Sequence, residues 1–435
     1  MLLERKGFMY TDLEERFNVI YPESNNATYN SLLNYSEEGK KTFQRWYRYK
    51  EGYSIDLVKN LINEYAQDEY GIILDPFTGS GTTLLGACEL GYEAVGFEVN
   101  PFSYFLATIK TRKHSVEIIK EFYHAYSSII DESKLQDIEK ELPLLSISHK
   151  VFDENVRKIM MNVRYLIDKY NENQEVKDLL LLGWLACLEE LSNYRKAGNG
   201  LKMRKTVKPR IITSDDVYGK LMSQFDIMYK DLIQNNSECK SILYNTSCLN
   251  MNQYINDNTL TGIIFSPPYA NCFDYTEIYK LELWFGDFVN EYSDLKKLRK
   301  KSLRSHLNGN LDENDLTVLS NEYLEQILIQ LESRKLWDKR IPKMLKLYFT
   351  DMYLLLKQCY VALKDNGFCS IIVSNSAYGG IIIPTDLIIA DIAERLGFKV
   401  DKIFVDRYII TSSQQYEITS SNKKYLRESI ICLMK

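Results

Sequence analysis

Short apolar runs alternate with amphipathic stretches along much of the chain, and this alternation predicts its secondary structure. The clearest case predicts a strand over Ile72 to Leu74, a helix over Thr82 to Leu90 that ends at Gly91, and a second strand over Ala94 to Phe97. Strand, turn, helix and strand thus follow one another within about one βαβ unit.

The same alternation returns in the last third of the chain. Strands are predicted at "SILYN", "TGIIF", "FCSIIVSN", "FKVDKIFVDRY" and "RESIICLMK", and helices at "LKLYFTDMYLLLKQCYVAL" and "DLIIADIAERL", with a turn at "KDNG". Strands separated by helices are typical of a parallel, doubly wound α/β sheet.

The region between these parts differs in character. Its patterns are helical and carry no strand signal, apart from a basic, glycine-containing loop at residues 195–210. We therefore predict an N-terminal arm and first part of a catalytic domain at 1–104, a largely helical insertion at 105–240, and the second part of the catalytic domain at 241–435.

Composition limits the classes of function. The 435 residues carry a formal net charge of -5, so a nucleic-acid surface would have to be a local basic patch. The eight cysteines include no CxxC pair and the four histidines are scattered, so no metal site is expected, and the thiols are expected to be reduced. The chain has no signal peptide and no apolar run long enough for a membrane helix, which predicts a soluble, cytoplasmic protein.

The first candidate site is the turn "DPFTGSGTT" between the first strand and its helix. Gly79 and Gly81 allow a tight turn and a close approach of backbone to ligand, and the helix start offers free N–H groups. Glu98, at the end of the next strand, can accept hydrogen bonds from both hydroxyls of a ribose. No lysine follows the glycines and the spacing is not GxGxxG, so the pattern favours an adenosine-bearing cofactor over a nucleoside triphosphate or a nicotinamide.

The second candidate site is "SPPY", Ser266 to Tyr269, directly after an apolar strand. The two prolines make a rigid corner that holds the Ser266 hydroxyl and the Pro267 carbonyl in one arrangement, where both can accept hydrogen bonds from a planar amino group. Tyr269 can stack on a flat ring. Both candidate sites follow the carboxyl ends of strands, where open α/β sheets bind ligands, so we expect them to face each other.

Together these two motifs resemble motifs I and IV of the S-adenosylmethionine-dependent DNA amino-methyltransferases. "RWYRYKEGYSIDLVKNLI", residues 45–62, resembles motif X of the same family. The resemblance implies a Rossmann-like methyltransferase sheet, mostly parallel with an antiparallel last strand. It implies S-adenosylmethionine as cofactor and double-stranded DNA as substrate.

The order X, I, insertion, IV resembles the α-type arrangement of the family, which makes the insertion at 105–240 a candidate target-recognition region. The resemblance also assigns roles to residues of this sequence. The implied cofactor residues are Tyr53, Ser54, Asp75, Phe77, Gly79, Ser80, Gly81, Thr82 and Glu98, and the implied catalytic residues are Ser266, Pro267, Pro268 and Tyr269. Where the family often has an acid after its third strand, near the adenine, this chain has Asn245, Thr246 and Ser247.

An exocyclic amine attacks poorly because its lone pair is delocalised into the ring. Accepting its hydrogens at Ser266 and Pro267 would favour a more tetrahedral nitrogen, and the base would have to be flipped out of the duplex to reach them. Within the family, serine before Pro-Pro-Tyr is commoner in N4-cytosine enzymes, and aspartate or asparagine in N6-adenine enzymes. The resemblance therefore favours cytosine, with adenine as the alternative.

The loop at 195–210 contains seven basic residues and no acid, which suits phosphate contact as well as a solvated loop. The predicted nucleic-acid contacts are Lys202, Arg204, Lys205, Lys208 and Arg210. A second basic run, residues 295–306, follows the SPPY corner. The leading hypothesis is a site-specific DNA methyltransferase of a restriction-modification system, with a cognate endonuclease as a possible partner. The alternatives are an RNA amino-methyltransferase, a small-molecule methyltransferase and a non-catalytic nucleic-acid binder.

Overall fold

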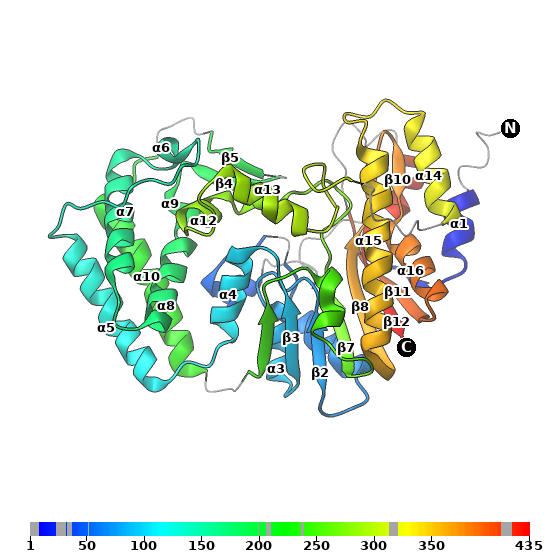
Figure 1. Cartoon of the computed structure of the whole chain (residues 1–435), viewed down its shortest axis with the longest axis horizontal. Coiled ribbons are helices and arrows are strands. Elements are labelled where there is room, and N and C mark those ends of the chain that lie inside the picture. Colours follow the sequence, from blue (N-terminus) through cyan, green and yellow to red (C-terminus); the bar gives the residue numbers. More distant parts are fainter. Residues whose placement is uncertain are drawn as a thin grey trace.

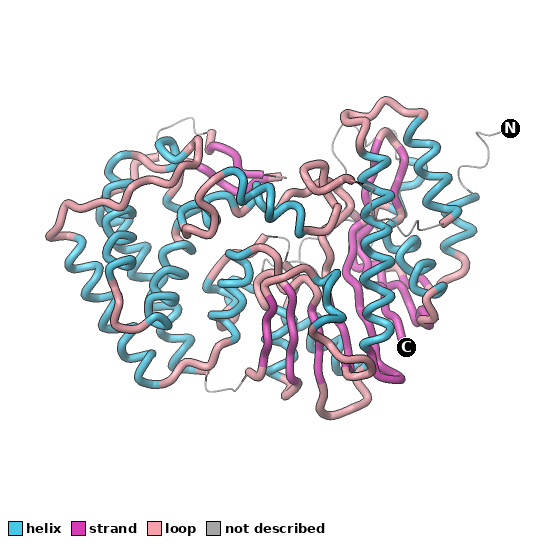
Figure 2. The backbone as a smooth tube through the Cα atoms, in the orientation of Figure 1, coloured by secondary structure: helices cyan, strands magenta, loops and turns pink. Residues whose placement is uncertain are grey.

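The computed structural model describes residues 8–22, 32, 37–50, 52–198, 200–205, 210–235, 239–312, 321–409 and 420–435. A twisted sheet lies at the centre of the right-hand part of the molecule, and a group of helices lies to its left (Figure 1). The carboxyl ends of the central strands meet along the upper edge of the sheet, beneath a long connection that links the two parts (Figure 2).

The main sheet has eight strands in the order β1-β11-β12-β8-β7-β2-β3-β6. Its strands are β1 (Val19–Ile20), β2 (Ile72–Asp75), β3 (Glu93–Phe97), β6 (Ser241–Tyr244), β7 (Leu260–Phe265), β8 (Leu363–Ser374), β11 (Lys399–Tyr408) and β12 (Arg427–Met434). All neighbouring strands are parallel except β12, which runs antiparallel to both β8 and β11. The predicted mostly parallel sheet with an antiparallel last strand is confirmed.

Apolar side chains on both faces of the sheet are buried, which explains why its central strands are continuously apolar. Ile73 and Ile264 pack against α2 (Ile55–Tyr65) and α3 (Thr82–Glu89) on one face. Leu74 packs on the other face, against a core built by α14 (Glu322–Glu332), α15 (Ile341–Ala362) and α16 (Thr385–Arg395), which α1 (Phe8–Glu14) also joins.

The helical block beside the sheet consists of α5 (Val116–Ser133), α6 (Ser148–Val151), α7 (Glu154–Lys169), α8 (Gln174–Ala186), α9 (Leu188–Leu191) and α10 (Ser214–Gln234). The chain enters it through α4 (Pro101–Thr111) and passes from α10 to β6 of the sheet. Three helices that follow β7, α11 (Tyr275–Ile278), α12 (Lys280–Phe285) and α13 (Tyr292–Lys301), lie between the sheet and the block (Figure 1). Trp184 of the block shares one buried core with Trp46, Phe102 and Trp284.

Short elements complete the described chain. They are the hairpins β4–β5 (Tyr194–Ala197 and Gly200–Met203) and β9–β10 (Ser376–Tyr378 and Ile381–Ile383), and single 3₁₀ turns at Glu38–Lys40, Gln44–Trp46, Cys248–Gln253 and Ser420–Tyr425. Within the described residues, no helix combines the length and apolarity needed to cross a membrane, and no group of three or more potential metal ligands occurs.

Three local predictions were wrong. The basic stretch at 195–210 begins as the antiparallel hairpin β4–β5, whose tip turns at Gly198 with φ 57°, because pairing across the hairpin outweighs its weak strand pattern. The predicted turn "KDNG" lies within β8, next to a register irregularity between β7 and β8. Cys88 and Cys239 form a disulfide in the structure, so the expectation that all thiols are reduced fails for this pair, which lies 151 residues apart in sequence.

Candidate active site

An open cavity lies at the carboxyl ends of β2, β3 and β7. The glycine turn and Glu98 line one end of it, and Ser266 and Pro268 line it from the end of β7. Residues 274–276 and 298–306, which follow β7 in sequence, form the opposite wall. The two motifs that the sequence analysis expected to face each other thus share one cavity.

The glycine turn is held by its own backbone and by Asp75. Asp75 Oδ1 accepts a hydrogen bond from Phe77 N at 2.9 Å, and Gly81 N donates to Thr78 O at 2.8 Å. Gly79 and Gly81 have φ of 52° and 84°, in the left-handed region that disfavours side chains. A Cβ at Gly81 would also lie 3.3 Å from Ala107 Cβ, so this turn requires glycine.

Glu98 is a half-buried carboxylate that lines the cavity. Its Oε2 accepts from Gly79 N at 2.9 Å and its Oε1 accepts from Asn100 N at 2.8 Å. Burial raises the pKa of Glu98 to about 7, against these two hydrogen bonds. The carboxylate therefore joins the glycine turn to the start of α4 and still borders the cavity.

Tyr53 and Asp75 meet behind the glycine turn. The Tyr53 hydroxyl donates to Asp75 Oδ2 at 3.1 Å, and burial raises the pKa of Asp75 to about 6. Ser54 instead begins α2, where its Oγ accepts from Asp56 N at 3.2 Å and donates to Glu38 Oε1 at 2.8 Å. Ser54 therefore positions α2.

The structure brings most of the predicted cofactor and catalytic residues to one place. The predicted residues that line the cavity are Tyr53, Phe77, Gly79, Ser80, Thr82, Glu98, Ser266 and Pro268. Thr246 and Ser247, at the position where the family often has an acid, line it as well, and Asn245 Nδ2 donates to Glu98 O at 2.8 Å.

Hydrogen bonds from the β9–β10 hairpin hold the SPPY corner in place. The carbonyl oxygen of Ala270, the residue after Tyr269, accepts hydrogen bonds from Ser376 Oγ and Tyr378 Oη, both at 2.9 Å. Ser266 Oγ lies 3.5 Å from the Tyr269 hydroxyl. The corner is thus braced by the β9–β10 hairpin while the Ser266 side chain faces the cavity.

Sequence reasoning missed several residues of the site. Asn100 begins α4, and its Oδ1 accepts from Phe102 N at 3.0 Å while its buried Nδ2, at the cavity, has no hydrogen-bond partner within the described part of the chain. Asn before Pro is a common helix start and was the available signal. Asp274, Ser305 and His306 also line the cavity and carry no local motif.

Lys110 supports the glycine turn from outside the cavity. Its Nζ donates to Ser80 O at 2.7 Å and to Gln44 Oε1 at 2.9 Å. Burial lowers the pKa of Lys110 to about 7. No motif marks this lysine, since it is brought to the turn only by the packing of α4.

The residues predicted to contact nucleic acid differ in their exposure to solvent. Lys202, Lys205 and Arg210 are exposed. Arg204 donates from Nη2 to Glu189 O at 2.9 Å and from Nε to Ser192 O at 3.3 Å, so it anchors the hairpin. Lys208 lies outside the described residues.

Comparison with known proteins agrees with this geometry. A family model described as "DNA methylase" (N6_N4_Mtase) matches residues 10–108. The chain is 30% identical over 407 residues to Type II methyltransferase M.AvaI of Anabaena variabilis, covering 86% of this chain and 83% of that protein. The chain belongs to the N6/N4 DNA methylase family. This methylase is also 29% identical over 466 aligned positions to Type II methyltransferase M.BsoBI of Geobacillus stearothermophilus, covering 96% of this chain and 90% of that protein, and 22% identical to M.MvaI of Kocuria varians.

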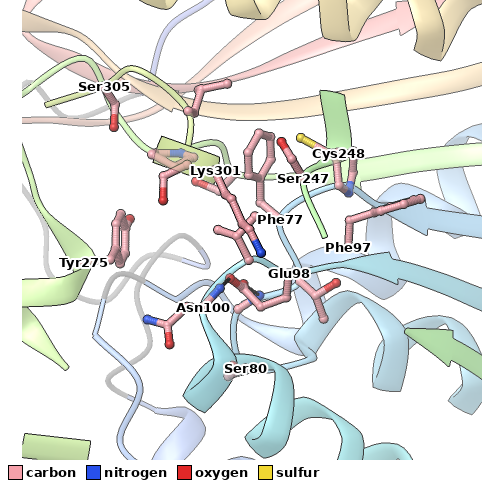
Figure 3. A pocket seen from close by; sticks show the side chains of 18 of the residues that line it. Phe77, Ser80, Phe97, Glu98, Asn100, Ser247, Cys248, Tyr275, Lys301 and Ser305 are labelled. Atoms are coloured by element: carbon pink, nitrogen blue, oxygen red, sulfur yellow. Dashed lines mark hydrogen bonds between the residues drawn. The ribbon is translucent and has the colours of Figure 1, made fainter. Parts of the chain in front are cut away.

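Membership in this family makes the methylase a DNA methyltransferase and implies a methyl donor. The residues of the cavity fit an adenosine-bearing donor. Glu98 offers a carboxylate for hydroxyl donors, and the unpartnered Asn100 Nδ2 offers a donor beside it. Gly79 lines the cavity beside Glu98, and Figure 3 shows Glu98, Asn100 and Ser80 at this end of it.

Proposed function

We propose that this methylase transfers a methyl group from S-adenosylmethionine to the N4 amino group of cytosine in double-stranded DNA. The observation that carries the proposal is the position of Ser266, which lies at the end of β7 in the same cavity as the glycine turn and Glu98. Serine at this corner favours cytosine over adenine among enzymes with this motif, and N6-adenine remains the second candidate.

The proposed cofactor site is the end of the cavity at β2 and β3. S-adenosylmethionine supplies an electrophilic methyl group on a sulfonium when it is bound. Glu98 would accept hydrogen bonds from the ribose hydroxyls, and Thr246 and Ser247 would border the adenine. Tyr53 and Phe77 would contact the remainder of the cofactor, and Asp75 would hold the glycine turn in place.

The proposed catalytic groups are fixed hydrogen-bond acceptors. Ser266 Oγ and the Pro267 carbonyl oxygen would each accept one hydrogen of the amino group, which concentrates the nitrogen lone pair toward the methyl group. The transfer would replace one N–H bond of the amino group by an N–C bond, with the demethylated cofactor as leaving group, and Ser266 Oγ and the Pro267 carbonyl oxygen would direct the lost proton toward solvent. Pro268 keeps the corner rigid, and Tyr269 would stack on the base after it leaves the duplex.

The proposed DNA-facing surface lies above the cavity. Lys296, Lys300 and Lys301 are exposed on α13, and Lys301 also lines the cavity. In the view of Figure 1, α13 and the β4–β5 hairpin both lie above the sheet. These lysines, with Lys202 and Lys205 of the hairpin region and Arg210, would contact phosphates on either side of a flipped base.

The names of the relatives, Type II methyltransferases, support a restriction-modification system that includes a cognate endonuclease. In that setting the methylase would act in the cytoplasm on its host's own DNA.

The test is to incubate the methylase with S-adenosylmethionine and unmethylated DNA, digest the DNA and identify the nucleosides by mass spectrometry. N4-methylcytosine is expected, and Ser266→Ala should lower the rate by about 100-fold or more. Ser127→Ala, at a serine of α5 remote from the cavity, is the control. N6-methyladenine would replace the proposal with the second candidate, and methylation of RNA alone would contradict a DNA substrate.

A further inference from the structure

Two neighbouring polar groups in the cavity wall have no hydrogen-bond partner. Ser305 is 1% exposed and His306 is 4% exposed, and both line the cavity that contains Ser266. Ser305 Oγ and His306 Nδ1 are buried and unpaired within the part of the chain that the structure describes. Buried polar groups are normally paired, so two adjacent unpaired groups on residues that line a cavity indicate a ligand that pairs with them.

The wall that carries these groups is rigidly attached to the SPPY corner. Ser305 O accepts a hydrogen bond from Cys272 N, three residues after Tyr269, at 3.2 Å. Arg304 N donates to Asp351 Oδ2 on α15 at 3.0 Å, and the Arg304 guanidinium forms an ion pair with the same carboxylate. The positions of Ser305 and His306 relative to Ser266 are therefore set by the fold and do not depend on a ligand.

A second set of contacts fixes the wall around Asp274. Asp274 Oδ2 accepts from Arg299 Nε at 2.9 Å and from Asn308 Nδ2 at 3.0 Å. The segment 299–308 thus wraps around one buried carboxylate that also lines the cavity. In Figure 3 the Ser305 side chain lies across the cavity from Glu98 and Asn100, at the end remote from the proposed cofactor site.

Ser305 and His306 can both act as hydrogen-bond donors. Burial lowers the pKa of His306, against the nearby Asp274 carboxylate, so its imidazole is neutral near pH 7. In the Nδ1–H tautomer this imidazole donates one hydrogen bond into the cavity, and the Ser305 hydroxyl donates a second.

Two adjacent donors distinguish the amino bases. Beside its amino group, cytosine presents two neighbouring acceptors, N3 and O2. Adenine presents one ring acceptor, N1, followed by a carbon-bound hydrogen. We propose that Ser305 and His306 donate hydrogen bonds to N3 and O2 of the extrahelical cytosine and thereby select cytosine as the methylated base. This inference rests on the proposed function and assigns base selection to residues outside the SPPY motif.

The test begins with the wild-type methylase and its mapped methylation site. Short duplexes that contain this site are prepared with cytosine or with an abasic position at the target. Ser305→Ala and His306→Phe should each lower kcat/KM on the cytosine duplex at least tenfold. Cofactor affinity by calorimetry and affinity for the abasic duplex should stay within twofold of wild type.

Two further variants separate base contact from a structural role. Ser302→Ala removes another hydroxyl of the same wall, but that hydroxyl already donates to Leu298 O at 3.1 Å, so activity should stay within twofold. His306→Asn keeps an amide donor near Nδ1 and should recover part of the activity lost in His306→Phe. Thermal unfolding of each variant reports whether the wall still folds.

The outcomes are distinguishable. If wild-type protein methylates no DNA, the proposed function fails before any variant is made. If wild-type protein forms N6-methyladenine, or if the variants weaken cofactor or abasic-duplex binding as much as they lower kcat/KM, the assignment of Ser305 and His306 is overturned. Loss of activity confined to duplexes that carry the cytosine supports it.

Discussion

At the scale of single residues, Glu98 and Lys110 are titratable groups from outside the glycine turn that hydrogen-bond to its backbone. Lys110 is buried and Glu98 is half-buried, and loss of solvation moves the pKa of each toward 7 from opposite sides. Cofactor binding should therefore depend on pH in the range where most methylation assays are run.

Cofactor affinity should rise as the pH increases from 6 to 8. A ribose hydroxyl donates to the ionised form of Glu98, and a carboxyl with a pKa of about 7 is mostly protonated at pH 6 and mostly ionised at pH 8. The dissociation constant for S-adenosylhomocysteine should fall about tenfold over this range. Isothermal titration calorimetry at fixed ionic strength measures it, and Glu98→Gln should bind weakly with a flat profile. A flat profile in the wild type would contradict the role of Glu98.

Lys110→Met should weaken cofactor binding about tenfold, although Lys110 itself lies outside the cavity. The variant leaves Ser80 O and Gln44 Oε1 without the donor that now holds them, which loosens the glycine turn. Lys110→Arg should bind more tightly than Lys110→Met, and Lys120→Met, at an exposed lysine of α5, should match wild type. The product nucleoside should be the same in all three variants.

At the scale of elements, residues 43–46, at the start of motif X, are tied to the helical block by the Asp231 carboxylate. Asp231 of α10 is fully buried, and its Oδ2 accepts from Phe43 N at 3.0 Å and from Trp46 Nε1 at 2.9 Å. Asp231→Ala should lower the free energy of unfolding by about 3 kcal/mol, because two buried donors and the paired Arg45 lose their acceptor. Urea denaturation measures the change, and Asp215→Ala, in the first turn of α10, is the control.

The lysines of α13 give a second prediction at this scale. Lys296→Gln combined with Lys300→Gln should weaken DNA binding and reduce the dependence of log K on log salt by about 2, the value expected for two lost phosphate contacts. Lys357→Gln with Lys364→Gln is the matched control, since these residues lie near the start of β8, at the edge of the sheet opposite the cavity. An unchanged salt slope in the α13 variant would place the DNA elsewhere.

At the scale of the whole molecule, the disulfide closes a long loop around the helical block. Its sulfurs belong to Cys88, near the end of α3, and Cys239, just before β6, with 151 residues of separation. Reduction should lower the free energy of unfolding by about 2–4 kcal/mol. Cofactor affinity should stay within twofold, because both cysteines lie at the edge of the sheet opposite the carboxyl ends. Denaturation with and without reductant measures the effect, and Cys88→Ser should be insensitive to reductant.

The sequence predicted those parts of the fold and site whose signals are local. Gly79, Gly81 and the Pro267–Pro268 pair impose backbone geometry on their own neighbours, and both motifs lie where strands end, so their meeting could be foreseen. Ser305 and Lys110 could not be placed, because only tertiary packing brings them to the cavity and the turn. The disulfide was missed for the same reason, since cysteine spacing carries no information on which distant strands and helices will be adjacent.

The shared core of the helical block bears on how new specificities can arise in such proteins. Phe122 and Trp184 of the block are buried together with Trp46, Phe102 and Trp284, which precede and follow the block along the chain. A chimera that exchanged only residues 105–240 would take part of this core from one parent and the rest from the other, and the packed side chains would not match in shape. Recombination that carries a parent's whole stretch from about residue 43 to about residue 300 would keep the core intact, so inheritance of specificity in this lineage should proceed by long exchanges or by point substitution.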